Sequence, residues 1–183
     1  GNVLELGEAA FNNNNLSDEE AFIFNRYDSD DDGIAEVYNE YLISYAGAKK
    51  ENVEIPNTVQ YIGRYAFSGT NLESVTIPNS VLSIAKYAFS NNLLTSISIP
   101  SSVTDMGWAV FNNNKTLDSE AFIYERTDSN ADGVAEINTS KIISYSGQKR
   151  SNIVIPSSAT VIGNDAFNGN NLENIIIPST ITS

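Results

Sequence analysis

The sequence predicts a solenoid, an elongated stack of short coils, rather than an ordinary globular domain. An Ile-Pro pair recurs every 22 residues, with its proline at Pro56, Pro78 and Pro100. A phenylalanine recurs at the same spacing, at Phe67, Phe89 and Phe111. A unit of this size cannot bury its own apolar side chains, so consecutive units must stack on one another. We therefore expect residues 1–183 to form one elongated body.

A longer period of 100 residues is superimposed on the short one. It relates, for example, Phe22 to Phe122, Tyr45 to Tyr145 and Pro56 to Pro156. Each 100-residue super-unit contains ordinary repeats and one long insertion, at about residues 12–52 and 112–152. The chain begins and ends in mid-repeat, which indicates a piece of a longer protein.

The pattern within one unit predicts two short extended segments and a turn. Apolar residues alternate over residues 72–77, as in a strand with one buried face. Pro78 should end this strand, because proline cannot donate a further ladder hydrogen bond. Residues 81–84 suggest a second extended segment, and residues 84–89 a single helical turn. Asn91 and Asn92 then return the chain, since asparagine tolerates left-handed backbone angles.

The repeated pattern L-x-x-V-x-I-P-x-x-V-x-x-I-x-x-x-A-F resembles the BspA-type leucine-rich repeat of bacterial and some protozoan surface proteins. Residues 53–67, 72–89, 94–111 and 153–167 carry the resemblance. It implies an α/β leucine-rich-repeat solenoid that is right-handed and strand-rich, with short helical turns and two inserted β-hairpin-like segments. It also implies a non-catalytic module, secreted or on the cell surface, that serves adhesion or recognition.

Composition narrows the possible partners. The formal net charge is −13, with 23 acidic and 10 basic residues. Such a chain is a poor partner for nucleic acid or an anionic membrane surface, and a better one for calcium or a basic protein. No apolar run approaches the roughly 20 residues that span a bilayer, so we expect no direct membrane insertion.

The absence of cysteine and histidine excludes two groups of enzymes. Neither a Ser-His-Asp nor a Cys-His arrangement can be assembled from this chain. A pair of carboxylates could still hydrolyse a glycosidic bond, so a carbohydrate-active enzyme remains the least favoured alternative.

Each insertion contains an acidic loop between two expected strands. Residues 28–36 and 128–136 both fit the pattern D-S-[DN]-x-D-G-[IV]-A-E. Oxygen ligands at alternate positions, followed by a glycine that permits a sharp turn, are typical of a calcium loop. We expect two sites, with Ile34 and Val134 contributing backbone carbonyls. The expected ligands are Asp28, Asp30, Asp32, Ile34 and Glu36 in one loop, and Asp128, Asn130, Asp132, Val134 and Glu136 in the other.

The loops are similar to those of thrombospondin type 3 repeats and to the start of an EF-hand loop. They lack the bidentate glutamate of an EF-hand at the twelfth position, where Asn39 and Thr139 stand. Magnesium is a less favoured ion because it prefers strict octahedral geometry. The alternative interpretation is a polar hairpin turn that binds no metal.

Two features are candidates for partner binding. Alternate strand positions, including Thr76 and Ser98, should line one exposed sheet face, where a protein or glycan ligand of a host or neighbouring cell would bind. Trp108 stands where related units have polar residues, which favours an exposed anchor. Alternatively, it packs beneath the following insertion. A calcium-stiffened spacer that binds nothing itself is the competing function.

Overall fold

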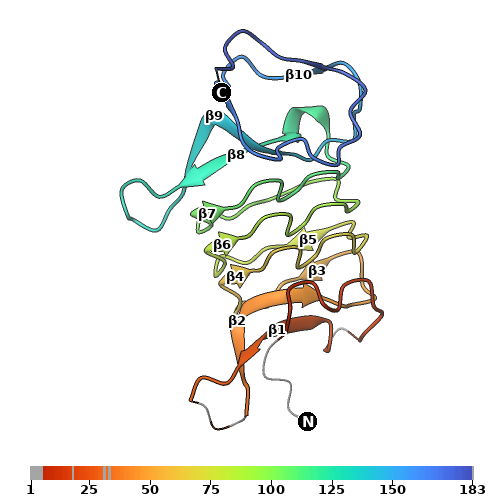
Figure 1. Ribbon diagram of the computed structural model, residues 1–183, viewed down its shortest axis with the longest axis vertical. Coiled ribbons are helices and arrows are strands. Elements are labelled where there is room, and N and C mark those ends of the chain that lie inside the picture. The colour runs from red at the N-terminus through yellow and green to blue at the C-terminus, as the bar shows by residue number, and fades with distance from the viewer. Residues whose placement is uncertain (1–5, 18, 31, 33, 183) are drawn as a thin grey trace.

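The computed structural model describes residues 6–17, 19–30, 32 and 34–182. Figure 1 shows short coils stacked along the long axis, with β1 near one end of the stack and β10 near the other. The solenoid expected from the two periods is therefore confirmed. Helix in the described residues is limited to the 3₁₀ helix η1 (Asp118–Glu120).

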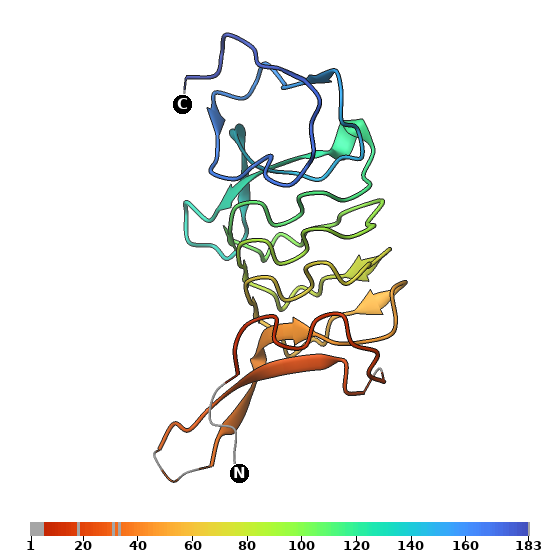
Figure 2. The ribbon, with the colours of Figure 1, turned by 45° about the vertical axis from the view of Figure 1, so that its right-hand side comes forward.

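The two insertions form long antiparallel hairpins. The first pairs β1 (Phe22–Tyr27) with β2 (Glu36–Tyr45), and the second pairs β8 (Phe122–Thr127) with β9 (Glu136–Tyr145). Both hairpins have the same register and the same two irregularities, which confirms that they are copies. Figures 1 and 2 show each hairpin projecting from the side of the stack, with its acidic loop at the tip.

The ordinary coils contribute strands of only two residues. They are β3 (Val53–Glu54), β4 (Tyr61–Ile62), β5 (Val75–Thr76), β6 (Ser83–Ile84), β7 (Asp105–Met106), β10 (Ile153–Val154), β11 (Val161–Ile162) and β12 (Ile175–Ile176). Successive coils pair in parallel, for example Val53 with Val75 and Ile62 with Ile84. One sheet has the order β1-β2-β4-β6-β7, so the first hairpin continues directly into the solenoid wall.

A column of aromatic rings runs through the core. Phe67, Phe89 and Phe111 are fully buried, and their rings are nearly parallel, with centroids 4.8 and 5.2 Å apart. Tyr45 and Tyr145 occupy the same column where an insertion enters the stack, against Phe67 and Phe167 respectively. The 22-residue phenylalanine spacing therefore reflects direct ring-on-ring contact between coils.

The helical turn expected over residues 84–89 is wrong. Ile84 belongs to β6, and residues 86–89 form a non-helical turn. Tyr87 has φ of 61° in this turn, and Tyr65 has the same φ one coil earlier. A left-handed residue in mid-turn interrupts the dihedral angles that a helix needs. The left-handed asparagine expected at Asn91 is confirmed, with φ of 56°.

Buried asparagines close the turns on the inner side. Asn92 Nδ2 donates to the carbonyls of Phe67 and Phe89, and its Oδ1 accepts the N–H of Leu72. Asn114 repeats this arrangement one coil later. These side chains satisfy backbone groups that no neighbouring strand reaches, which is why they tolerate burial.

We predict that Phe89→Ala destabilises the protein strongly. The substitution removes the middle ring of the column and leaves a cavity that rigid coils cannot fill, at a cost of about 3–5 kcal/mol. Urea denaturation measures the loss. The control is Leu93→Ala, at a side chain that is 38% exposed, where a change within about 0.5 kcal/mol is expected. Equal effects of the two substitutions would contradict a column that holds the stack.

Candidate functional site

The first acidic loop gathers its carboxylates at one point. One carboxylate oxygen from each of Asp28, Asp30, Asp32 and Glu36 lies within 4.8 Å of the others. The predicted ligand side chains of this loop therefore come together. Asp31 and Gly33 of the same motif lie outside the described residues.

Backbone N–H groups orient these carboxylates. The N–H of Asp32 donates to Asp28 Oδ1 at 3.1 Å and to Asp30 Oδ1 at 3.3 Å. The N–H of Ile34 donates to Asp32 Oδ1 at 2.8 Å, and the Ile34 side chain is exposed. The isoleucine side chain has no donor atom, so Ile34 could contribute only backbone atoms to a site.

The second loop repeats the arrangement with one amide. Carboxylate oxygens of Asp128, Asp132 and Glu136 lie within 4.8 Å of one another. Asn130 Oδ1 accepts the N–H of Asp132 at 3.0 Å, while its Nδ2 donates to Asp132 Oδ2 at 3.1 Å. The N–H of Val134 donates to Asp132 Oδ1, as in the first loop.

Glu36 is held in its ionised form by the residue across the loop. The backbone N–H of Ser29 donates to Glu36 Oε2 at 2.9 Å, and the Ser29 hydroxyl donates to the same oxygen. These two bonds lower the pKa of Glu36 below its ordinary value. Ser129 makes the equivalent bonds to Glu136 in the second loop.

The donor set fits a hard divalent cation. Each loop presents only oxygen donors, which Ca²⁺ prefers, and no histidine or cysteine that would favour a transition metal. The loops are also closed by their own N–H to carboxylate bonds, so the fold of the turn does not itself require an ion.

The second hairpin is fastened to the coil below it. The N–H of Ala135 donates to the carbonyl of Ser101 at 2.7 Å. The guanidinium of Arg126 donates to the carbonyl of Pro100 at 3.0 Å and to that of Val103 at 3.3 Å. The base of the acidic loop, at Ala135, is thereby tied to the solenoid wall.

The predicted partner-binding positions Thr76 and Ser98 are exposed, but only Thr76 lies in a strand, because residues 85–104 contain none and the expected strand at Ser98 is wrong. Thr76 and Ser98 both face outward, as do Glu54, Val154 and Ile176. Two consecutive coils form an open hollow of about 590 Å³ on this face. The hollow is lined by residues 54–57 and 76–80, so it includes Thr76. Ser98 lies on the next coil along the stack.

Trp108 is half-buried, so it combines the two predicted alternatives. Part of its indole packs against the main core cluster. The ammonium of Lys86 lies 4.0 Å from the ring centroid. Trp108 also lines a hollow together with Lys141 of the second insertion. The ring is therefore accessible, yet fixed in position by its neighbours.

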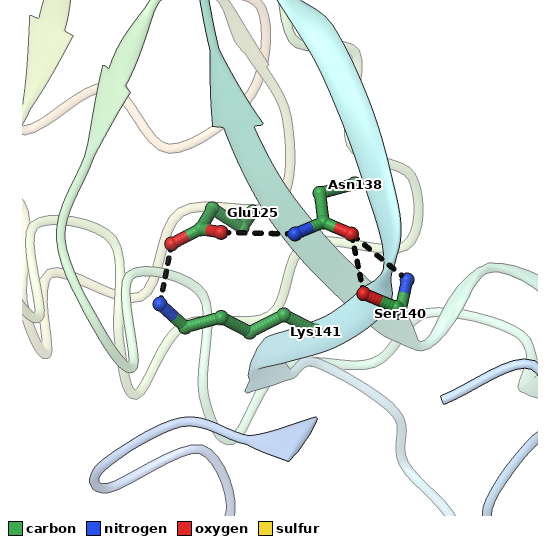
Figure 3. Close-up of polar contacts among 4 residues, drawn as sticks. All are labelled: Glu125, Asn138, Ser140 and Lys141. Atoms are coloured by element: carbon green, nitrogen blue, oxygen red, sulfur yellow. Dashed lines mark hydrogen bonds and ion pairs between the residues drawn. The ribbon is translucent and has the colours of Figure 1, made fainter. Parts of the chain in front are cut away.

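A polar cluster beside Trp108 was not anticipated from the sequence. Lys141 forms an ion pair with Glu125, and Asn138 Nδ2 donates to the other oxygen of that carboxylate (Figure 3). Asn138 Oδ1 accepts from both the N–H and the hydroxyl of Ser140. The Lys141 ammonium lowers the pKa of Glu125. The only available signal was that the first copy has tyrosines at two of these positions, Tyr38 and Tyr41.

The repeat pattern matches a known family. Residues 43–130 and 136–183 match six copies of the BspA type leucine rich repeat region. The chain belongs to this family. The match covers the ordinary coils from residue 53 onward, most of the second insertion and residues 43–52 of the first, so the resemblance seen in the residues is confirmed.

Several solved structures are similar to this chain. A leucine rich cell surface protein from Faecalibacterium prausnitzii is 26% identical, with 72% of this chain and 42% of that chain covered and a TM-score of 0.45. The pneumococcal vaccine antigen PcpA is 19% identical, with 74% and 44% covered and a TM-score of 0.46. This chain thus spans less than half the length of either. No curated protein matches it. Within the described residues, no helix has the length and apolar character to cross a membrane.

We predict that Ser29→Ala raises the pKa of Glu36 toward its ordinary value of 4.5, because the hydroxyl bond is lost while the backbone bond remains. The depressed pKa stabilises the folded loop above the unfolded-state pKa, and this contribution is lost as pH falls through the folded-state value. Carboxyl ¹³C NMR titration measures it. Ser129→Ala, the matched change in the other loop, should leave Glu36 unaltered. An unchanged Glu36 pKa in Ser29→Ala would contradict the assignment.

We predict that Arg126→Ala loosens the second hairpin. Without the two guanidinium bonds to the coil, the N–H of Ala135 should exchange with solvent faster, which hydrogen exchange measures directly. Arg26→Ala, the equivalent change in the first hairpin, is the control and should leave Ala135 protected. Unaltered exchange at Ala135 in the first variant would show that Arg126 does not fasten the hairpin.

Proposed function

We propose that this chain is a non-catalytic recognition module, secreted or attached to a cell surface, that binds a protein or glycan ligand of a host or neighbouring cell. The observation that carries the proposal is the open hollow over residues 54–57 and 76–80. It lies on the outward sheet face of a rigid stack, and stacked repeats use such continuous surfaces for binding.

The character of this face suits a protein or glycan. Exposed Glu54, Thr76 and Ser98 offer hydrogen-bonding groups, whereas Val154 and Ile176, farther along the stack, are more than half exposed and apolar. Contact surfaces combine such apolar and polar groups. Nucleic acid is an unsuitable ligand because the chain carries a formal charge of −13.

Calcium would stiffen the two projecting hairpins. The clustered carboxylates of each loop repel one another, and a divalent cation between them offsets that repulsion. Asp28, Asp30, Asp32 and Glu36 would hold the ion in the first loop. Asp128, Asn130, Asp132 and Glu136 would do so in the second, where Asn130 supplies Oδ1. The carbonyls of Ile34 and Val134 would complete the sites. Extracellular modules bind calcium with dissociation constants of about 10⁻⁴–10⁻³ M, which an exposed loop can reach.

A structural spacer is the second candidate function. It is favoured by the bonds that tie the second hairpin to the coil at Pro100, Ser101 and Val103, because they stiffen the side of the stack without forming a binding surface. A spacer needs rigidity but no ligand, so binding experiments separate the two candidates.

We expect a calcium titration to give heat and to raise the melting temperature. Calcium at 100 times its dissociation constant stabilises the folded state by about 2.7 kcal/mol per site. Asp32→Asn and Asp132→Asn should each remove one of two binding events in calorimetry, and the double variant should remove both. Magnesium at the same concentration serves as the control ion. No heat and no stabilisation at millimolar calcium would end this part of the proposal.

Binding of the purified protein to arrays of neutral glycans and extracellular proteins tests recognition by the sheet face. Thr76→Arg and Ser98→Arg should abolish any specific signal, because a large cation on this face blocks contact over the hollow. Thr95→Arg, at an exposed coil corner, is the matched control and should bind as the unaltered protein does. Array signals that survive both face variants would contradict the assigned surface, and silence throughout would favour the spacer.

A further inference from the structure

The second insertion leaves a hollow in the side of the stack. Ile142 of β9 pairs with Ile162, and Tyr145 stacks on Phe167. Between these two pairs the inserted strand has three residue steps, from Ile142 to Tyr145, whereas the next coil has five, from Ile162 to Phe167. The inserted strand therefore lacks the turn that an ordinary coil forms at this place. A hollow of about 290 Å³ remains between the turns on either side. It is lined by Trp108, Lys141, Val161, Ile162, Gly163 and Asn164.

The first super-unit shows what fits in the equivalent place. There Glu8 stands for Trp108, and Arg64 stands for Asn164. Glu8 Oε1 accepts the backbone N–H of Arg64 at 3.1 Å, so a carboxylate occupies that position. The rings of Tyr41 and Tyr61 stack 5.9 Å apart beside it.

The second super-unit lacks these groups. Trp108 carries no carboxylate, and the backbone N–H of Asn164 has no protein acceptor within the described part of the chain. Lys141 and Val161 replace the two stacked tyrosines. The glycine at the back wall is retained, as Gly63 in one copy and Gly163 in the other. The frame is thus the same, while the carboxylate is missing from one of the two copies.

The hollow is lined by one cation, Lys141, and one aromatic ring, Trp108, and a second cation, Lys86, lies outside the lining. Lys86 lies over the Trp108 ring, and Lys141 is fixed by its ion pair with Glu125 (Figure 3). A half-buried aromatic ring with a few fixed polar groups is the usual composition of a small-ligand site. The volume is at the lower end for such sites, which suits one sugar unit.

We propose that this hollow is a subsite for one carboxylate-bearing pyranose, a uronic- or sialic-acid unit of an acidic glycan. The proposal goes beyond the recognition function above, because this hollow shares no lining residue with the one on the sheet face. The sugar carboxylate takes the place that the Glu8 carboxylate has in the first copy and accepts the N–H of Asn164. The apolar face of the pyranose lies against Trp108, while Lys86 and Lys141 offset its charge.

An acidic peptide is the competing occupant. An aspartate or glutamate side chain could accept the same N–H and meet the same cations. It has no flat apolar face to cover an indole, however, and the accessible ring of Trp108 would remain unused. The combination of an aromatic face with a carboxylate position therefore favours the sugar.

The single tryptophan of the chain reports binding directly. We expect trigalacturonate to change the fluorescence of Trp108 saturably, with the same affinity in calcium and in EDTA. The same trisaccharide with its carboxylates reduced to alcohols should bind at least about tenfold more weakly, equivalent to 1.4 kcal/mol. A sialylated trisaccharide tested in parallel distinguishes the two sources of the acidic unit.

Trp108→Glu introduces the carboxylate that the first copy has at Glu8. This carboxylate should itself accept the N–H of Asn164 and so exclude the sugar carboxylate. By calorimetry, its affinity for the acidic trisaccharide should fall at least about tenfold, while its circular dichroism spectrum at the assay temperature stays that of the folded protein. Glu8→Gln alters the equivalent position of the first copy, and Thr76→Arg alters the sheet face. Both should bind the trisaccharide normally.

Three results would overturn the subsite: no saturable signal up to about 10 mM of either acidic sugar, equal binding of the reduced trisaccharide, or an oligoglutamate peptide that binds more tightly than both sugars. Failure of the wider recognition proposal is distinguishable, because it appears as array silence or as insensitivity to Thr76→Arg and Ser98→Arg. The subsite can fail while those sheet-face variants still abolish binding.

Discussion

Stacking of one coil on the next is the interaction on which the whole structure depends. A coil contributes strands of two residues and a few apolar side chains, which are too little to form a core alone. Burial becomes complete only between neighbours, as the parallel rings of Phe67, Phe89 and Phe111 show. The 22-residue spacing is therefore an energetic requirement, because a shift of one residue would move each ring out of register with the next.

The insertions satisfy this requirement and still change the surface. Each contributes one long strand that keeps the register, with Tyr45 or Tyr145 entering the aromatic column. The same strand omits the bulging turn of an ordinary coil. The extra residues project as a hairpin that carries the acidic loop, and the omitted turn leaves room beside Trp108. One departure from the repeat thus accounts for both sites proposed outside the sheet face.

Duplication provides a comparison within one chain. Side chains that hold the stack are the same in both copies, as at Tyr45 and Tyr145. The groups that line the hollow differ, with Glu8 and Arg64 in one copy and Trp108 and Asn164 in the other. The acidic loops are partly conserved between the copies. Both keep the same motif, but the second has Asn130 where the first has the carboxylate of Asp30. Equivalent frames therefore carry different surface chemistry.

The sequence by itself determined the solenoid, the two hairpins and the oxygen-rich loops, because each depends on residues that are close in the chain or repeated at a fixed spacing. Alternation over residues 72–77 and the pattern of residues 28–36 are local signals of this kind. The helical turn that the sequence predicts over residues 84–89 is absent, since nothing local in the sequence reveals the left-handed φ of Tyr87. Only the tertiary structure placed Trp108 beside Lys141 and buried Asn92 between coils. Those neighbours are decided by how coils distant in sequence stack.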